Sequence, residues 1–216
     1  MQFTTAIFDM DGTLFDSERI ALDSWQAAFR RYGVHVSRKV LEEVIGVDGK
    51  GSREYLSRLA PNGVGFEDLA RHARDIRKEY IEGHGLPMKA GSAELLRLFH
   101  DRGIRVGLAT TTHAERTLEN LNRANISEFF QVVISGDQVD RGKPYPDIYL
   151  KALKELRSAP DEAIAIEDSD SGIRSAHAAG IRVIYVPDIK VIDAETRDCV
   201  HRQYATLMDL WEEIAA

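Results

Sequence analysis

From about residue 92 to residue 186 the chain alternates between short β-favouring runs and amphipathic helical patterns, and this rhythm constrains the fold more than any other feature. Alternation of this kind predicts βαβ units in an α/β fold, with a parallel sheet and helices on both of its faces. The strands expected here are residues 104–109, 131–135, 163–166 and 182–186, and the helices are residues 92–99, 115–123, 147–156 and 172–179.

One more strand is expected near the amino end, where the apolar run of residues 4–8 ends at Asp9 and Asp11. Residues two apart in an extended chain point the same way, so both carboxylates leave the strand on one side. Gly12 then permits a sharp turn. Two like charges at a strand end are unfavourable unless a cation or a phosphate is the reason for them. We therefore expect a nucleophile and an acid/base around a bound metal.

A block of helical patterns separates this first strand from the alternating region. Gly83 and Pro87 bound a hinge-like stretch after it. The predicted organisation is an α/β core of residues 1–16 and 84–216, with residues 17–83 inserted as an α-helical cap domain. The helices expected in the cap are residues 19–32, with Ser17 as N-cap, and residues 38–44, 52–59 and 66–81.

Composition narrows the class of protein. The 216 residues carry a net charge of −7, which argues against binding to nucleic acid or to anionic membranes. Cys199 is the single cysteine, so no intrachain disulfide and no cysteine-based zinc site can form. No apolar run approaches the ~20 residues of a membrane span, and the amino end lacks the pattern of a signal peptide. The expectation is a cytoplasmic monomer, because the cap should cover the site without a partner.

Polar side chains follow the predicted strands at the edge where reactive groups of parallel sheets gather. Each has an ordinary explanation by itself: a turn cap, a strand-end cap, a solvated charge or a helix N-cap. Only their joint occurrence at strand ends favours a site. The residues are Asp9 and Asp11 after the first strand, Thr110 and Thr111 after the second, Lys143 beyond the third, and Glu167 and Asp168 at the end of the fourth.

Together these motifs resemble the haloacid dehalogenase-like superfamily. The resemblance rests on Asp-x-Asp-Gly-Thr after a strand, a strand-terminal Thr, a Lys-Pro and a late Glu-Asp-Ser-x-Ser-Gly, in that order. It covers nearly the whole chain, and the helical insert looks like the C1-type cap of this superfamily. The phosphatase and β-phosphoglucomutase branch is the most similar. The resemblance implies a Rossmann-like core and Mg²⁺-dependent phosphoryl chemistry.

Roles for individual residues follow from the same resemblance. Asp9 would be the nucleophile that forms an aspartyl-phosphate, and Asp11 the acid/base that protonates the leaving oxygen and then activates water. Thr110 and the following backbone N–H groups, including that of Thr111, would hold the phosphoryl oxygens, while Lys143 balances charge.

A magnesium site is implied as well. Its ligands would be Asp9, the backbone carbonyl of Asp11 and Asp168, with Glu167 close by, either directly or through water.

Reaction type and substrate are less constrained. Asp11 excludes the dehalogenases, which lack this acid/base. The β-phosphoglucomutases have a His shortly after the first motif, whereas residues 17–21 contain none, and Thr13 replaces their valine. Hydrolysis of a small phosphate monoester, first of all a sugar phosphate, is therefore preferred. The alternatives are a β-phosphoglucomutase-like phosphomutase and a non-catalytic phospho-ligand-binding module. In the cap, Lys50 and Arg53 are candidate substrate contacts, with an ordinary helix-start charge as the equal alternative.

Overall fold

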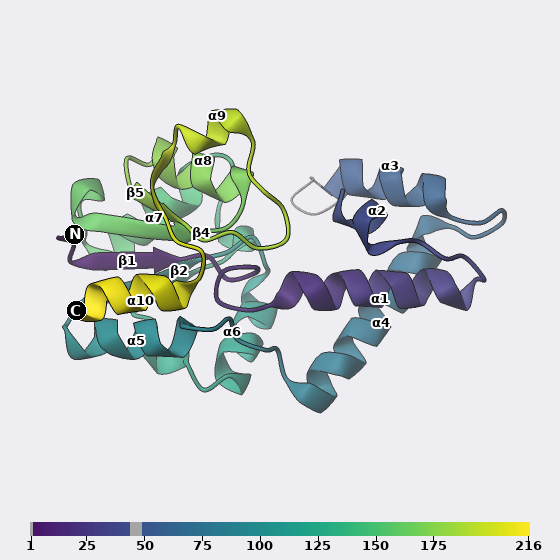
Figure 1. The fold of residues 1–216 in the computed structure, drawn as a ribbon, viewed down its shortest axis with the longest axis horizontal. Coiled ribbons are helices and arrows are strands. Elements are labelled where there is room, and N and C mark those ends of the chain that lie inside the picture. Colours follow the sequence, from purple (N-terminus) through teal and green to yellow (C-terminus); the bar gives the residue numbers. More distant parts are fainter. Residues whose placement is uncertain (1, 44–48) are drawn as a thin grey trace. The chain divides into compact units, whose positions relative to one another are not determined.

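The computed structural model describes residues 2–43 and 49–216, except for the side chains of residues 49 and 50. The chain divides into two compact units. One consists of the segment up to Asp16 together with residues 87–216, and the other of Ser17–Leu86 (Figure 1). No helix among the described residues is long and apolar enough to cross a lipid bilayer.

The first unit is built on a parallel sheet of six strands within the described residues, in the order β3-β2-β1-β4-β5-β6. The first strand of the chain therefore lies in the interior of the sheet, between β2 and β4. The strands are β1 (Thr5–Phe8), β2 (Arg105–Ala109), β3 (Val132–Ile134), β4 (Ala163–Glu167), β5 (Arg182–Tyr185) and β6 (Val200–Gln203).

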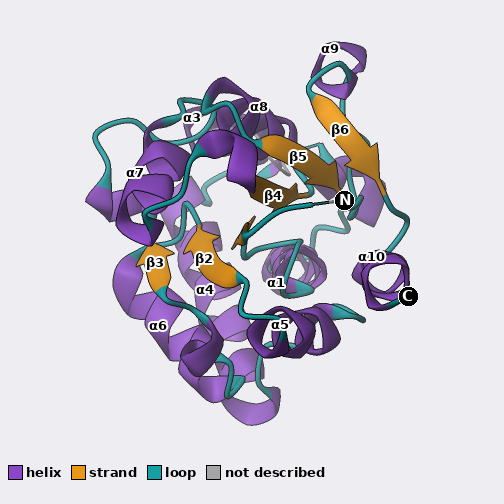
Figure 2. Cartoon of the chain, turned by 90° about the vertical axis from the view of Figure 1, so that its left-hand side faces the viewer, coloured by secondary structure: helices purple, strands orange, loops and turns teal. Residues whose placement is uncertain are grey.

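Helices cover both faces of this sheet, which confirms the predicted Rossmann-like α/β class (Figure 2). Helices α7 and α8 pack on one face, while α5 packs on the other with α10 beside it. The helices of this unit are α5 (Ser92–Asp101), α6 (Ala114–Arg123), α7 (Asp147–Leu156), α8 (Asp170–Ala178), α9 (Ala194–Arg197) and α10 (Leu207–Ala215), with short 3-10 turns at η1 (Ser127–Phe129), η2 (Gly136–Gln138) and η3 (Pro160–Glu162).

Strand β1 shows how the two faces are filled. Its residues are fully buried, so neither face can carry the polar positions of a half-exposed strand. Ile7 belongs to the core cluster that contains Tyr149 of α7 and Ile173 of α8. Phe8, one residue on, faces α5, where its ring centroid lies 5.9 Å from that of Phe99. Packing on both faces holds the strand in place, so the position of its carboxyl end is fixed.

The second unit is helical, and no strand occurs in its described part, residues 17–43 and 49–86. Helices α1 and α4 pack against each other, and Tyr32 contacts His72 across them through a 2.9 Å hydrogen bond. Ser17 is not the N-cap that was expected: it is the first residue of α1, and its buried hydroxyl has no hydrogen-bond partner among the described residues. The helices are α1 (Ser17–Arg31), α2 (Arg38–Glu42), α3 (Gly49–Leu59) and α4 (Phe66–His84).

The two chain segments that join this helical unit to the sheet unit run side by side. Asp16 N donates to Pro87 O at 2.9 Å, and Lys89 N donates to Leu14 O at 2.8 Å. Between them Phe15 and Met88 form an antiparallel bridge. Helix α4 continues through His84 before the chain turns, so the compact units divide after Leu86 rather than after residue 83.

The last stretch of the chain contains elements that the sequence pattern did not predict. Strand β6 pairs with β5 at the edge of the sheet and has no fully buried residue, so its four residues lack the apolar run that marks an interior strand. Helix α9 has only four residues, too few for a helical period to be visible.

Candidate active site

The turn that follows β1 fixes the position of Asp9 at the strand end. Asp9 is 7% exposed, and its backbone N donates to Ile166 O of β4 at 3.0 Å. Gly12 has a φ of +85°, and a Cβ there would lie 2.3 Å from Asp168 Oδ2. Only glycine satisfies both the positive φ and this close approach. The turn therefore brings the ends of β1 and β4 together.

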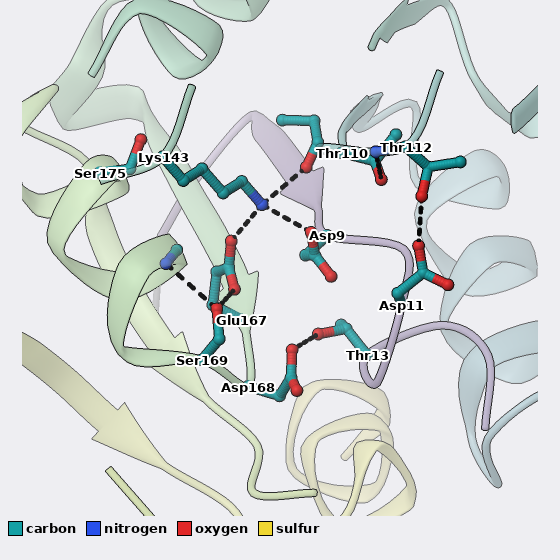
Figure 3. Close-up of polar contacts among 12 residues, drawn as sticks. Asp9, Asp11, Thr13, Thr110, Thr112, Lys143, Glu167, Asp168, Ser169 and Ser175 are labelled. Carbon is teal, nitrogen blue, oxygen red and sulfur yellow. Dashed lines mark hydrogen bonds and ion pairs between the residues drawn. The ribbon is translucent and has the colours of Figure 1, made fainter. Parts of the chain in front are cut away.

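Lys143 is the central group of the site, as Figure 3 shows. Its Nζ donates to Asp9 Oδ1 at 2.5 Å, to Glu167 Oε1 at 2.6 Å and to Ala109 O at 2.9 Å. Its side chain is only 3% exposed. Three donors on three acceptors satisfy the ammonium group, which is what burial of a charge requires. Lys143 thus links the carboxyl ends of β1, β2 and β4.

Glu167, the last residue of β4, is fully buried. Besides Lys143, Tyr149 Oη donates to its Oε1 at 2.6 Å and Ser169 Oγ to its Oε2 at 3.3 Å. Helix α8 also approaches closely, because a Cβ on Gly172 would lie 2.0 Å from the Glu167 carboxylate. Donors and packing on several sides leave the Glu167 side chain little freedom to move.

Asp168 follows directly and accepts a 3.0 Å hydrogen bond at Oδ1 from the buried hydroxyl of Thr13. One ligand oxygen each from Asp9, Glu167 and Asp168 lie within 4.8 Å of one another. Lys143 contacts two of these three carboxylates, those of Asp9 and Glu167. The oxygen-only donor set of the three is the one that hard cations such as Mg²⁺ prefer. The residues present fit a bound divalent cation.

Burial and mutual repulsion perturb the acids of this cluster. Burial raises the pKa of Asp9 to about 8, an effect that Lys143 opposes and Glu167 reinforces. Burial, and then the charges of Asp9 and Glu167, raise the pKa of Asp168 well above its usual range. Burial works to lower the pKa of Lys143, but the same two acids raise it overall. The lysine therefore stays charged, whereas Asp9 and Asp168 hold protons that a cation could displace.

The end of β2 supplies hydroxyl groups to the same rim. Thr110 is 1% exposed, and its Oγ1 accepts a 3.1 Å hydrogen bond from Thr112 N, which leaves its own O–H free to donate. Thr112 Oγ1 in turn donates to Asp11 Oδ2 at 2.7 Å. The Asp11 carboxylate is accordingly turned toward Thr112, apart from the carboxylate cluster (Figure 3).

Comparison with known proteins identifies the family. Residues 6–186 match the haloacid dehalogenase-like hydrolase family. The chain belongs to this family. It is 31% identical over 179 residues to the phosphorylated carbohydrates phosphatase of Thermotoga maritima, covering 83% of this chain and 82% of that protein.

Solved structures agree with this assignment. A haloacid dehalogenase-like hydrolase of Deinococcus radiodurans, with bound phosphate and sodium, superposes with a TM-score of 0.82 at 25% identity, covering 99% of this chain and 96% of that one. CbbY of Rhodobacter sphaeroides in complex with phosphate gives a TM-score of 0.77 at 27% identity, covering 96% of each chain. Since its relatives include named phosphatases, the protein is a haloacid dehalogenase-like phosphoric monoester hydrolase.

Of the residues singled out in the sequence of this hydrolase, the structure brings together Asp9, Lys143, Glu167 and Asp168. A metal contact from the backbone carbonyl of Asp11 stays a prediction.

The remaining candidates lie outside this cluster. Thr111 is exposed at the rim, on the loop that contains Thr110 and Thr112. Arg53 lies in the helical unit, where it pairs with Glu67 at 2.8 Å and lies 5.0 Å from the ring centroid of Phe66. Lys50 is the second residue of the same helix, but its side chain is outside the described residues. Substrate contacts by these three residues stay predictions.

Sequence reasoning missed three residues of this hydrolase that bind the candidate groups: Thr13, Thr112 and Tyr149. Thr112 lies in the same run of three threonines as Thr110, so its position was visible, but its partner was not. Tyr149 could have been found by asking where a buried tyrosine hydroxyl would find an acceptor.

Proposed function

We propose that this hydrolase is a Mg²⁺-dependent phosphatase that cleaves a small phosphate monoester through an aspartyl-phosphate on Asp9. The observation that supports it most directly is the contact of Lys143 with both Asp9 and Glu167 beside the three-carboxylate cluster. The buried ammonium group of Lys143 lies against the buried carboxylate of Asp9 at the end of a strand. This arrangement suits a nucleophile that must approach an anionic phosphate ester, because the ammonium reduces their repulsion.

In the first step a carboxylate oxygen of Asp9 attacks phosphorus, and the bond from phosphorus to the leaving oxygen breaks. Lys143 reduces the charge on Asp9 and on the incoming phosphoryl group, which otherwise repel each other. The hydroxyl of Thr110 donates its proton to a phosphoryl oxygen, while one of its lone pairs accepts the N–H of Thr112.

Asp11 moves the proton in both steps. It protonates the leaving alkoxide, and its carboxylate then takes a proton from the water that attacks the aspartyl-phosphate, so phosphate is released and both acids return to their starting states. Asp9, Asp168 and Glu167 would hold Mg²⁺, with the backbone carbonyl of Asp11 as a further ligand. The ion supplies charge neutralisation between the nucleophile and the phosphoryl group.

The substrate class we propose is a phosphorylated sugar or a metabolite of similar size. This rests on the similarity to a phosphorylated carbohydrates phosphatase and to CbbY in complex with phosphate. Arg53, Lys50 and Thr111 are the residues proposed to contact the substrate.

The decisive experiment is phosphate release from p-nitrophenyl phosphate by the purified protein, with and without Mg²⁺. Turnover that needs Mg²⁺ and is abolished by Asp9→Asn supports the proposal. No turnover of any phosphate ester in a screen of phosphorylated metabolites would instead favour a phospho-ligand-binding module.

The same protein should be given glucose 1-phosphate, because the fold is also compatible with a phosphomutase. Conversion to glucose 6-phosphate without net release of phosphate would replace hydrolysis by the mutase reaction. Release of inorganic phosphate in proportion to substrate consumed supports hydrolysis.

A further inference from the structure

The hydroxyl of Thr112 makes a contact that has no role in the proposed reaction steps. It donates to Asp11 Oδ2 at 2.7 Å, across 101 residues of sequence. A hydroxyl-to-carboxylate bond is among the stronger hydrogen bonds, because its acceptor is charged. The contact therefore fixes a definite orientation of the Asp11 side chain.

The backbone of Thr112 is itself held on several sides. Its N donates to Thr110 Oγ1 at 3.1 Å, and its O accepts from Gly136 N at 3.3 Å and from Thr117 Oγ1 at 3.4 Å. The turn η2 approaches so closely that a Cβ on Gly136 would lie 2.5 Å from Thr111 O. Since a threonine side chain is also stiff about χ1, the hydroxyl is presented from a rigid support.

The alternative orientation of Asp11 would be unproductive. Asp11 is two residues from Asp9, and a carboxylate swung toward the cluster would add a fourth acid beside Asp9, Glu167 and Asp168. Engagement of Oδ2 by Thr112 keeps the Asp11 carboxylate away from that cluster (Figure 3).

We infer that Thr112 is the positioning residue of Asp11: its hydroxyl selects the side-chain orientation from which Asp11 transfers the proton to the leaving oxygen. This inference rests on the proposed phosphatase function. The same residue, through its backbone N–H, also holds the oxygen of Thr110, so one loop residue sets the spacing between the phosphoryl-binding hydroxyl and the acid.

Thr112→Val tests this, because valine keeps the shape and the backbone N–H and removes only the hydroxyl. Two aryl phosphates that differ by one nitro group give the readout. Phenyl phosphate releases a basic phenolate that needs the proton, whereas p-nitrophenyl phosphate releases an anion that leaves without one. We expect kcat/KM of the valine variant to fall at least about tenfold on phenyl phosphate and no more than about threefold on p-nitrophenyl phosphate.

Two further variants separate positioning from a structural role. Thr112→Ser should return both substrates to within about twofold of the wild type, since it restores the donor. In an Asp11→Asn background Thr112→Val should have almost no additional effect, because residues that act through one another are not additive. An unchanged melting temperature of the valine variant supports the assignment.

The outcomes that contradict the inference are distinct from those that contradict the function. Suppose the wild type is active and the valine variant has the same kcat/KM as the wild type on both esters. Or suppose its kcat/KM falls equally on both, and the effect of Thr112→Val adds fully to that of Asp11→Asn. Either result means that Thr112 does not position the acid. If the wild type releases no phosphate from either ester, the proposed function is wrong and the inference is wrong with it.

Discussion

Lys143 Nζ lies 2.5 Å from Asp9 Oδ1, although 134 residues separate the two in sequence. Both side chains are at most 10% exposed. A buried ion pair of this kind is weak support for stability as such, but removing one partner leaves an uncompensated charge. The pair is better understood as a source of positive charge where an anion must bind, since Lys143 opposes the rise that burial causes in the pKa of Asp9.

Replacing Lys143 by methionine should therefore reduce both activity and stability. We expect turnover to fall at least ~10²-fold, and the unfolding free energy of the metal-free protein to fall by ~3–5 kcal/mol. Phosphate release and urea unfolding measure the two effects. Arg141→Met is the matched control: Arg141 lies two residues earlier and pairs with Asp147 at 2.9 Å on the surface, so its loss should change neither quantity appreciably.

The raised pKa of Asp9 makes stability depend on pH. Its pKa rises from 3.8 to about 8 on folding, so in that range the folded protein holds a proton that the unfolded chain has released. The contribution to stability is fully present below 3.8 and is lost as the pH rises through about 8. The unfolding free energy of the metal-free protein should thus decline over this window, by an amount on the order of a few kcal/mol.

Mg²⁺ should reverse that trend, because it needs the deprotonated acids. The rise in melting temperature on adding Mg²⁺ should be larger at pH 8.5 than at pH 6. Differential scanning fluorimetry at the two pH values, with Asp9→Asn as the control, measures it. An equal rise at both pH values, or an undiminished one in the asparagine variant, would contradict this.

Gly172→Ala is expected to damage the site although alanine favours helices. A helical Gly→Ala change gains ~1 kcal/mol at an unhindered position. Here the added Cβ would lie 2.0 Å from the Glu167 carboxylate, which is fully buried and cannot retreat into solvent. We expect lower stability and at least about tenfold weaker activation by Mg²⁺. Titration of activity with Mg²⁺ tests this.

Gly83→Ala provides the comparison, since Gly83 is an exposed residue of α4 with nothing within 4 Å of its Cβ position. It should leave activity unchanged and raise the unfolding free energy by ~0.4–1 kcal/mol. If the two glycine variants behave alike, the contact between α8 and Glu167 is not the cause.

Tyr149→Phe removes a single hydrogen bond, the 2.6 Å bond to Glu167 Oε1. Because that acceptor is a buried charged group, the loss should cost ~1–3 kcal/mol of unfolding free energy. Burial, and then the charge of Glu167, raise the pKa of the Tyr149 hydroxyl well above its usual value, so it donates throughout the accessible pH range. Chemical denaturation measures the effect. Tyr145→Phe, at a 52% exposed tyrosine, should be close to neutral.

The sequence was sufficient for the fold class because the alternation of strands and helices is a local pattern. The strand ends could be located for the same reason, and with them the order in which Asp9, Thr110, Lys143 and Glu167 reach one rim. Strand β6 was not predicted, because an exposed edge strand has no buried face and therefore no apolar pattern in the sequence. Ser17 was expected to be the N-cap of a helix over residues 19–32, whereas the helix begins with Ser17 itself.

Partners of the candidate residues were harder to predict than the residues themselves. Glu167 was expected near a metal, but its bonds to Lys143 and Tyr149 depend on how α7 lies against the sheet. The contact between Thr112 and Asp11 joins two loops, and the periodicity of the sequence does not predict how two loops are placed relative to each other. Side-chain pairing across long sequence separations requires the folded backbone.

The hydrogen bond from Asp16 N to Pro87 O has a consequence for how this chain can vary. The chain leaves the sheet unit at Asp16 and re-enters it at Pro87, beside the point where it left. For the sheet unit, the segment between these two residues is therefore one long closed loop. The entropy of closing such a loop grows only logarithmically with its length. Insertions, deletions or wholesale exchange of the helical segment should therefore leave the register of the parallel strands intact. We therefore expect the insert to tolerate divergence while the candidate site residues of the sheet unit keep their positions.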